Sequence, residues 1–307
     1  MGKSATTVLC FMIKSISSKY QDIIQMVPLN GINTMELKKH FLKALSIAMR
    51  AGFEIIAAVC DNHSVNRAFM MNYLSDGSLK ACVQNPLDSS KKLFLLLDPT
   101  HTFKNMYNNF QKKGVFKLPA CELCPQPIIA NFHHANVLYE KDSLLHIRMA
   151  HKLSPYVLNP SNIQRQSAKL FVGLFHESTA ATFQYYVERE GMSEWEGTYI
   201  FVRLMSNLWK IINVKNSTFG YKTRDTLRTP IKSENDEKIQ ILKQYLCLFK
   251  QWQASKFPGL SAPTFSSVIL MCESLAQMSV YLINHIHYLL LGGLQSDPLE
   301  SRYGRLR

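Results

Sequence analysis

Two aspartates directly follow apolar stretches of the chain, a position at which α/β proteins often place reactive carboxylates. Asp61 ends the run "FEIIAAVC", and Asp98 ends the run "KKLFLLL". A carboxylate at the C-terminal end of a strand faces the crevice in which α/β sheets bind their ligands, and its oxygens suit Mg²⁺ or Mn²⁺. Either residue could instead cap the element that follows it, because polar residues come after Asp61 and Pro99 comes after Asp98.

The C-terminal stretch "QSDPLESRYGRLR" holds two further acids, Asp297 and Glu300. One interpretation is structural, with Asp297 as N-cap, Pro298 as the first helical residue and Glu300 closing a capping box. The other makes Glu300 a metal ligand that projects from the start of a helix toward the strand ends. The arginines that follow suit phosphate contacts but also suit a solvated helix face, so both interpretations stay open from the residues alone.

A third group, "CELC" with two histidines downstream, has part of the pattern of a zinc site. The spacing of Cys121 and Cys124 fits, but the adjacent His133 and His134 are poorly spaced as paired ligands. We therefore do not expect zinc here. The chain has no Gly-rich loop of the P-loop or dinucleotide-binding type, which argues against a metabolic enzyme with a nucleotide cofactor.

Composition narrows the class of protein. The 307 residues are 47% hydrophobic and 19% charged, as in packed globular proteins. The net charge of +13 suggests a polyanionic partner such as nucleic acid, or a basic surface that serves only solubility. Seven cysteines, an odd number, indicate reduced intracellular thiols. We find no signal peptide, and the longest apolar stretch, 278–294, is short for a membrane span and is expected to be a buried helix.

The elements that must position these residues can be located by pattern. Strands are expected at 7–14, 19–27, 53–60 and 91–98, and the capping pattern of Asn33 with Glu36 predicts a helix. Apart from Glu54 the run 53–60 is apolar, as is typical of a central strand buried on both faces. A helix after Pro99 completes a β-β-α-β-α-β-α order, which predicts a mixed α/β sheet. From Gly114 onward no strong strand is expected. Helical patterns occupy 141–153, 162–187, 198–214, 236–255 and 264–291, with a polar loop at 220–236.

Taken together, "CDNHSVNRAF", "LLLDPTHTFKNMYNNF" and "GGLQSDPLESRYGRLR" resemble the P-element family of eukaryotic cut-and-paste DNA transposases, which includes the THAP-domain transposases. The resemblance covers essentially the whole chain. It implies an α/β, RNase H-like mixed sheet with flanking helices, interrupted by a large, mostly α-helical insertion domain. The sheet domain would comprise 1–113, the insertion 114–284, and the return to the sheet domain 285–307.

In that family three acids hold two divalent metal ions, and the resemblance identifies Asp61 with the second acid and Glu300 with the third. It implies Mg²⁺- or Mn²⁺-dependent strand cleavage and strand transfer on transposon ends and target DNA, by a homo-oligomer in the nucleus. The segment His101, Lys104, Asn105, Asn108 and Asn109 matches the family and is expected to support the core and the DNA side.

Two departures from the family concern the start of the chain. The strand that carries the first acid does not precede Thr7, and the N-terminal zinc-finger module is also missing. We therefore expect the chain as given, a fragment or a derived copy, to be catalytically inactive. The alternative is a domesticated, non-catalytic protein that binds DNA or protein partners.

The family's insertion domain binds GTP, and "NLWKIINVKN" resembles its guanine-contacting segment. The resemblance gives Trp209, Asn213 and Asp297 as guanine-contacting positions. Lys210 stands where the family has an aspartate. An aspartate accepts hydrogen bonds from a guanine edge and a lysine cannot, so this departure argues against GTP as a cofactor.

Overall fold

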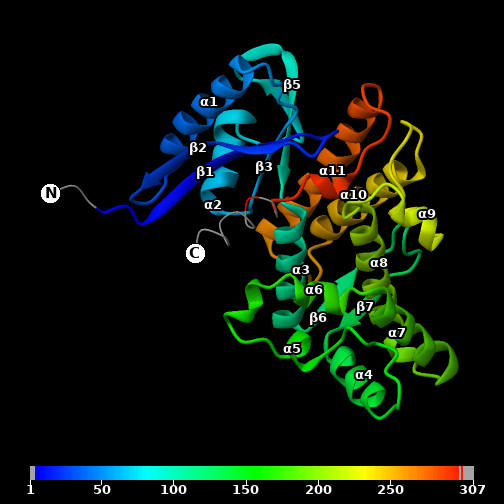
Figure 1. Cartoon of the computed structure of the whole chain (residues 1–307). Coiled ribbons are helices and arrows are strands. Elements are labelled where there is room, and N and C mark those ends of the chain that lie inside the picture. The colour runs from blue at the N-terminus through cyan, green and yellow to red at the C-terminus, as the bar shows by residue number, and fades with distance from the viewer. Residues whose placement is uncertain (1–3, 297–298, 300–307) are drawn as a thin grey trace.

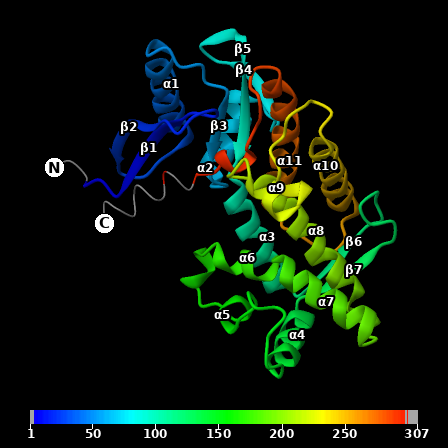
Figure 2. The same ribbon diagram turned by 45° about the vertical axis from the view of Figure 1, so that its right-hand side comes forward.

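The computed structural model describes residues 4–296 and Leu299. It has a small α/β part and a larger helical part (Figures 1 and 2). The α/β part begins with an antiparallel hairpin, β1 (Thr7–Lys14) and β2 (Gln21–Leu29), and continues into helix α1 (Thr34–Arg50). A second sheet has the strand order β3-β5-β4, formed by β3 (Ala57–Cys60), β5 (Asp88–Leu97) and β4 (Cys82–Asn85). Helix α2 (Ser64–Phe69) and a π-helical turn (Met70–Leu74) connect β3 to β4.

Local sequence signals explain where the first long helices begin and end. The Asn33 side chain accepts a hydrogen bond from the Glu36 backbone N–H at 2.9 Å, so the predicted capping residue does start α1. Asp98 caps α3 (Pro99–Lys113) in the same way, with Pro99 in the first turn. Helix α3 ends at Lys113 and is followed by Gly114, whose φ of +75° favours glycine.

The central strand of the three-stranded sheet is β5, whereas the sequence pattern had placed β3 there. Residues 93–97 of β5 are fully buried or nearly so. Among the described residues β3 pairs with β5 alone, in parallel, and it begins at Ala57 rather than at Phe53. The Val59 side chain is 36% exposed. An apolar run indicates a strand that could be buried on both faces, but it does not fix which neighbours that strand has.

The helical part starts with a short hairpin and then winds through eight helices of very different lengths. The hairpin is β6 (Val115–Leu118) with β7 (Ile128–Asn131). The helices are α4 (His133–Ser143), α5 (Pro155–Leu158), α6 (Lys169–Leu174), α7 (Glu177–Arg189), α8 (Glu196–Ile212), α9 (Phe219–Thr223), α10 (Glu237–Ser255) and α11 (Ala262–Ile283).

Several predictions for this part were wrong. The β6–β7 hairpin contradicts the expected lack of strands after Gly114. The helix expected at 141–153 is absent from the described structure except for the last residues of α4, which ends at Ser143. Buried Asp142 accepts hydrogen bonds from the backbone N–H groups of Met149 and Ala150 and so turns the chain. The pattern at 162–187 breaks into α6 and α7 at His176, whose ring caps α7. The pattern at 264–291 ends at Ile283.

Helix α11 links the helical part to the sheet. Its Ser274 hydroxyl donates to the backbone carbonyl of Leu95 in β5 at 2.5 Å, and its Ser267 hydroxyl lies 2.6 Å from that of Thr102 in α3. By length and composition α11 could cross a membrane, but 61% of its apolar window is buried inside the protein. One hydrophobic cluster runs from Phe94 in β5 through α3 into the helical part. The division into domains at 113/114 and 284/285 stays a prediction.

Candidate active site at the sheet edge

The parallel pairing of β3 with β5 brings Asp61 and Asp98 to the same edge of the sheet. Cys60 and Leu97 are partners in register, and the two aspartates follow them directly. Burial raises the pKa of the Cys60 thiol, and the negative charges of Asp61 and Asp98 raise it further. The thiol therefore stays protonated and is not a nucleophile.

Asp61 is held in one orientation with one oxygen left open. Its Oδ1 accepts hydrogen bonds from the His63 backbone N–H at 3.0 Å and from Asn66 Nδ2 at 2.7 Å. Among the described residues none donates to Oδ2. The side chain is half-buried. A carboxylate that is fixed by two donors and still has a free oxygen is suited to binding a cation or a polar substrate group.

The loop "NHSVN" fixes the surroundings of Asp61 as well. Arg67 Nη1 donates to Asn62 Oδ1 at 2.9 Å, and Asn62 Nδ2 donates to the backbone carbonyl of Pro263 at the start of α11. His63 caps α2. The polar residues after Asp61 thus cap the next helix, as the structural interpretation held, and at the same time orient the carboxylate.

Asp98 has a different role at the same edge. Its side chain is fully buried, Oδ1 accepts from the Thr100 backbone N–H at 3.0 Å, and Oδ2 accepts from the Ser296 hydroxyl at 2.5 Å. His101 Nε2 lies 3.9 Å from Oδ2. Both carboxylate oxygens are therefore engaged inside the protein. The sequence gives no signal for the Ser296 contact, since the two residues are 198 positions apart.

Its hydrogen bond to Asp98 places Ser296 at the strand ends. Leu299 lines a cavity beside β3. Asp297 and Glu300 lie outside the described residues, so their assignment as a guanine contact and a metal ligand stays a prediction. Within residues 4–296 no three His, Cys, Asp or Glu side chains gather closely enough to hold a metal ion.

The cysteines of "CELC" close a two-residue turn. The backbone groups of Cys121 and Cys124 form two hydrogen bonds with each other, and all seven cysteines of the chain are free thiols. Burial raises the pKa of both thiols. The motif is accounted for as a turn.

Two residues expected to contact guanine lie at the C-terminal end of α8, and both have partners within the protein. The Trp209 indole packs against the rings of Phe103 and Phe171, with centroids 5.0 and 4.7 Å apart. Asn213 Oδ1 accepts a hydrogen bond from Gln295 Nε2 at 3.1 Å. Asn213 thus contacts the C-terminal segment at Gln295, which precedes Asp297 by two residues in the sequence.

Lys210, on the same turn of α8, belongs to a cluster of four charges. Its Nζ lies 2.8 Å from Glu177 and 3.0 Å from Asp225, and Arg228 pairs with both acids. Burial alone would raise the pKa of Glu177, but the hydrogen bond from Lys210 and the two positive charges outweigh it and lower that pKa below its ordinary value. Lys210 is thus an ion-pair partner at a position where the resemblance implied an acid.

The asparagines of α3 support neighbouring loops. Asn109 Oδ1 accepts from the Ser261 backbone N–H at 2.7 Å, which holds the start of α11. Asn108 Nδ2 donates to the Arg165 carbonyl at 3.4 Å. These contacts agree with the predicted support of the core. Contact with DNA stays a prediction.

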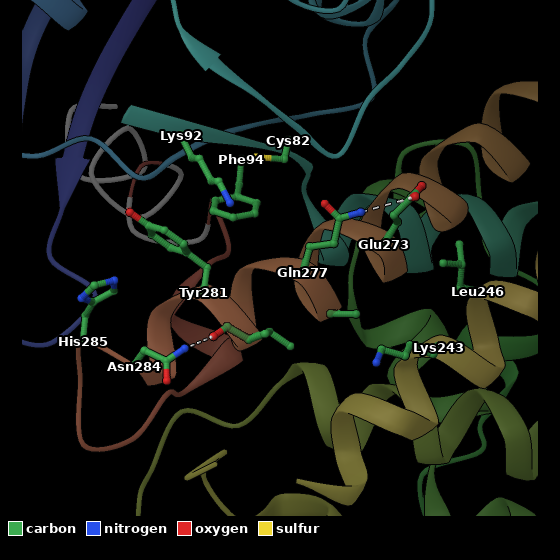
Figure 3. A pocket seen from close by; sticks show the side chains of 12 residues that line it. Cys82, Lys92, Phe94, Lys243, Leu246, Glu273, Gln277, Tyr281, Asn284 and His285 are labelled. Atoms are coloured by element: carbon green, nitrogen blue, oxygen red, sulfur yellow. Dashed lines mark hydrogen bonds between the residues drawn. The ribbon is translucent and has the colours of Figure 1, made fainter. Parts of the chain in front are cut away.

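A second cavity, of about 630 Å³, lies between the β4–β5 hairpin and helices α10 and α11. Figure 3 shows Lys92 beside Tyr281 on one side and Lys243 on the other. Lys92 Nζ lies 5.5 Å from the centre of the Tyr281 ring. The sequence did not reveal this cleft, because its lining comes from segments far apart in the chain.

Comparison with known proteins agrees with this geometry. Residues 2–74 match the family described as TNP-like, RNase H N-terminal domain. The whole structure resembles the Drosophila P element transposase strand transfer complex, with a TM-score of 0.78 and 18% sequence identity, over 97% of this chain and 64% of that chain. A search of curated protein sequences finds no match. Residues 2–74 are thus similar to a TNP-like RNase H N-terminal domain, and the chain has an RNase H-like fold like that of the P element transposase.

Proposed function

We propose that this chain is a DNA-binding protein of the transposase type, and that any strand cleavage and strand transfer by it would centre on Asp61. The observation that carries the proposal is that Asp61 lies at a strand end and that, within residues 4–296, no group donates to its Oδ2. The fold that surrounds it is the one shared with the P element transposase. The charge of +13 supports a polyanionic partner. A nuclear location and self-association belong to the same proposal.

The residues at the sheet edge differ in how well they fit a divalent cation. Asp61 fits, because it is half-buried, oriented by Asn66 and open at one oxygen. Asp98 does not, because both of its oxygens accept hydrogen bonds within the protein. We propose Glu300 as the second ligand. A bound Mg²⁺ or Mn²⁺ would activate a water or a 3′-OH and stabilise the leaving oxygen. GTP is not part of the proposal, because Lys210 is paired with two acids.

The test is cleavage and transfer of a labelled DNA duplex with Mg²⁺ or Mn²⁺ by the wild type and by Asp61→Asn. The asparagine keeps an oxygen for Asn66 and for the His63 N–H, so the loop should remain folded while the charge is lost. We expect product formation to fall by about 100-fold or more, with DNA binding retained. Asp76→Asn, at an exposed site, serves as the matched control. Cleavage that survives in Asp61→Asn contradicts the proposal.

A non-catalytic DNA-binding protein is the second candidate. It is favoured by the finding that, within residues 4–296, no three potential ligands gather at one site. It predicts DNA binding without a metal requirement and without cleavage, in line with the expected inactivity. With about six phosphate contacts, affinity should fall by roughly 10³ between about 50 and 200 mM salt. Binding without cleavage would select this candidate, and loss of both activities would remove both candidates.

A further inference from the structure

The cleft of about 630 Å³ beside the β4–β5 hairpin is separate from the sheet edge that carries the two aspartates. Lys92 of β5 lines the cleft, and Asp98 follows it by six residues in the sequence. At about 3.3 Å per residue along a strand, the two positions are roughly 20 Å apart. Helix α11 spans the same distance, since its first turn accepts a hydrogen bond from Asn62 and its last turn lines the cleft with Tyr281. A ligand in this cleft would therefore occupy a second site.

Three rings form an aromatic wall on one side of the cleft (Figure 3). The centre of the Tyr281 ring lies 5.5 Å from that of Phe94 and 5.2 Å from that of His285. Phe94 is buried, Tyr281 is half-buried and His285 is exposed, so the wall leads from the core to the surface. Ala276 and Val280 of α11 extend the apolar lining. Such a surface suits a planar aromatic group, because ring contacts add to the free energy gained by burying apolar area.

Two lysines on opposite sides of the cleft carry its charge (Figure 3). Lys92 and Lys243 are both exposed, and neither forms an ion pair with any residue that the structure describes. Glu273 is the one acid among the described lining residues, and it lies 3.8 Å from Lys250, which does not line the cleft. The cleft therefore presents two positive charges that no acid balances at ion-pair distance within the described part of the chain.

The size and position of the cleft are those of a small-molecule site. Ligand pockets commonly measure about 300–1,000 Å³ and occur where separate structural parts meet. This cleft falls within that range, and it lies between a hairpin of the α/β part and helices α10 and α11 of the helical part. The complementary ligand is apolar in the middle and negatively charged toward both lysines.

We propose that this cleft binds a small molecule with a planar aromatic body and an anionic group at each end. The body would lie against Tyr281 and Phe94, and the carboxylate or phosphate groups would accept hydrogen bonds from Lys92 and Lys243. A charge-assisted hydrogen bond is stronger than the contact of an exposed ammonium group with a ring, so Lys92 would leave the Tyr281 ring for the ligand. This inference does not rest on DNA binding or on cleavage.

The test uses naphthalene-2,6-dicarboxylate, a planar aromatic dianion, and the full 307-residue chain. The control ligand is 2-naphthoate, which has the same rings and one carboxylate. Affinity is measured by isothermal titration calorimetry at low salt, where exposed ion pairs are least screened. We expect the dicarboxylate to bind about fivefold more tightly than 2-naphthoate, because its second anion pairs with a second exposed lysine. Nuclear Overhauser contacts should join the naphthalene protons to the rings of Tyr281 and Phe94.

Paired variants locate the site. Lys92→Gln and Lys243→Gln should each weaken binding of the dicarboxylate by about fivefold. Lys91→Gln is the matched control and should leave binding unchanged, because side chains alternate along β5 and Lys91 pairs with Glu54 at 3.2 Å instead.

An added DNA duplex should not displace the dicarboxylate. Complete displacement by the duplex would assign both lysines to a DNA-binding surface and would overturn the proposal. Equal affinity for the two ligands, an equal effect of Lys91→Gln, the lack of contacts to Tyr281, or no binding at all would each overturn it as well.

Discussion

Replacing Ser296 by alanine should destabilise the protein, because its hydroxyl donates to a buried carboxylate. Asp98 is fully buried, and its Oδ2 accepts this hydrogen bond at 2.5 Å. A hydrogen bond to a charged group contributes about 1.5–3 kcal/mol to stability. We therefore expect Ser296→Ala to lower the free energy of unfolding by about 2 kcal/mol.

Urea unfolding followed by circular dichroism measures this change. The matched control is Ser266→Ala, which removes an exposed hydroxyl that donates to a carbonyl of its own helix. That change should cost less than about 0.5 kcal/mol. If both variants have the same midpoint and slope, the contact with Asp98 does not hold the C-terminal segment at the sheet edge, and the reasoning is refuted.

Two further predictions concern packing and pH. Gly259→Ala would place a Cβ 2.6 Å from the fully buried indole of Trp252, so thermal or urea unfolding should show a loss of about 1–3 kcal/mol. Gly293→Ala, with nothing within 4 Å of the added Cβ, should leave stability unchanged. Burial lowers the pKa of His134 below 6.5, so the folded protein takes up this proton at lower pH than the unfolded chain. The stability from neutral His134 is present above pH 6.5 and is lost as the pH falls through the folded pKa. Unfolding at about pH 7 and about pH 5 should therefore show a smaller pH dependence in His134→Gln, and an NMR titration showing an unshifted His134 would contradict this.

The positions of three long helices could be predicted from capping residues and apolar periodicity. Asn33 caps α1 through the Glu36 N–H, and α8 and α10 occupy almost the ranges that apolar periodicity indicated. A capping pair and the apolar periodicity of a helix each involve residues that are close in the sequence, so both can be recognised from the sequence alone. Strand β4 was missed because four residues with one buried side chain, "CVQN", carry no periodicity to detect.

Pairing and partner choice could not be predicted in the same way. The apolar runs of β3 and β5 look alike, and only the order of strands in the sheet makes β5 central. Trp209 was assigned by resemblance as a guanine contact, which stays a prediction, and its packing against the rings of Phe103 and Phe171 could not be foreseen from the sequence. Asp61 was placed correctly at a strand end. The sequence does not show that Asn66 and the His63 N–H both donate to Oδ1 and that no group within residues 4–296 donates to Oδ2.

Helix α11 explains how residues so distant in sequence can meet at one edge. Its first turn accepts a hydrogen bond from Asn62 beside Asp61, and Ser274, further along, donates to β5. The chain leaves α11 at Ile283 and reaches Ser296 within thirteen residues, hydrogen-bonded to Asp98. Because hydrogen bonds at Pro263 and Ser274 fix α11 against the α/β part, they also restrict the path of the chain that follows α11. The helical part therefore acts as the structural support that holds Ser296 at the strand ends, and changes in α11 should affect the site even where they touch neither aspartate.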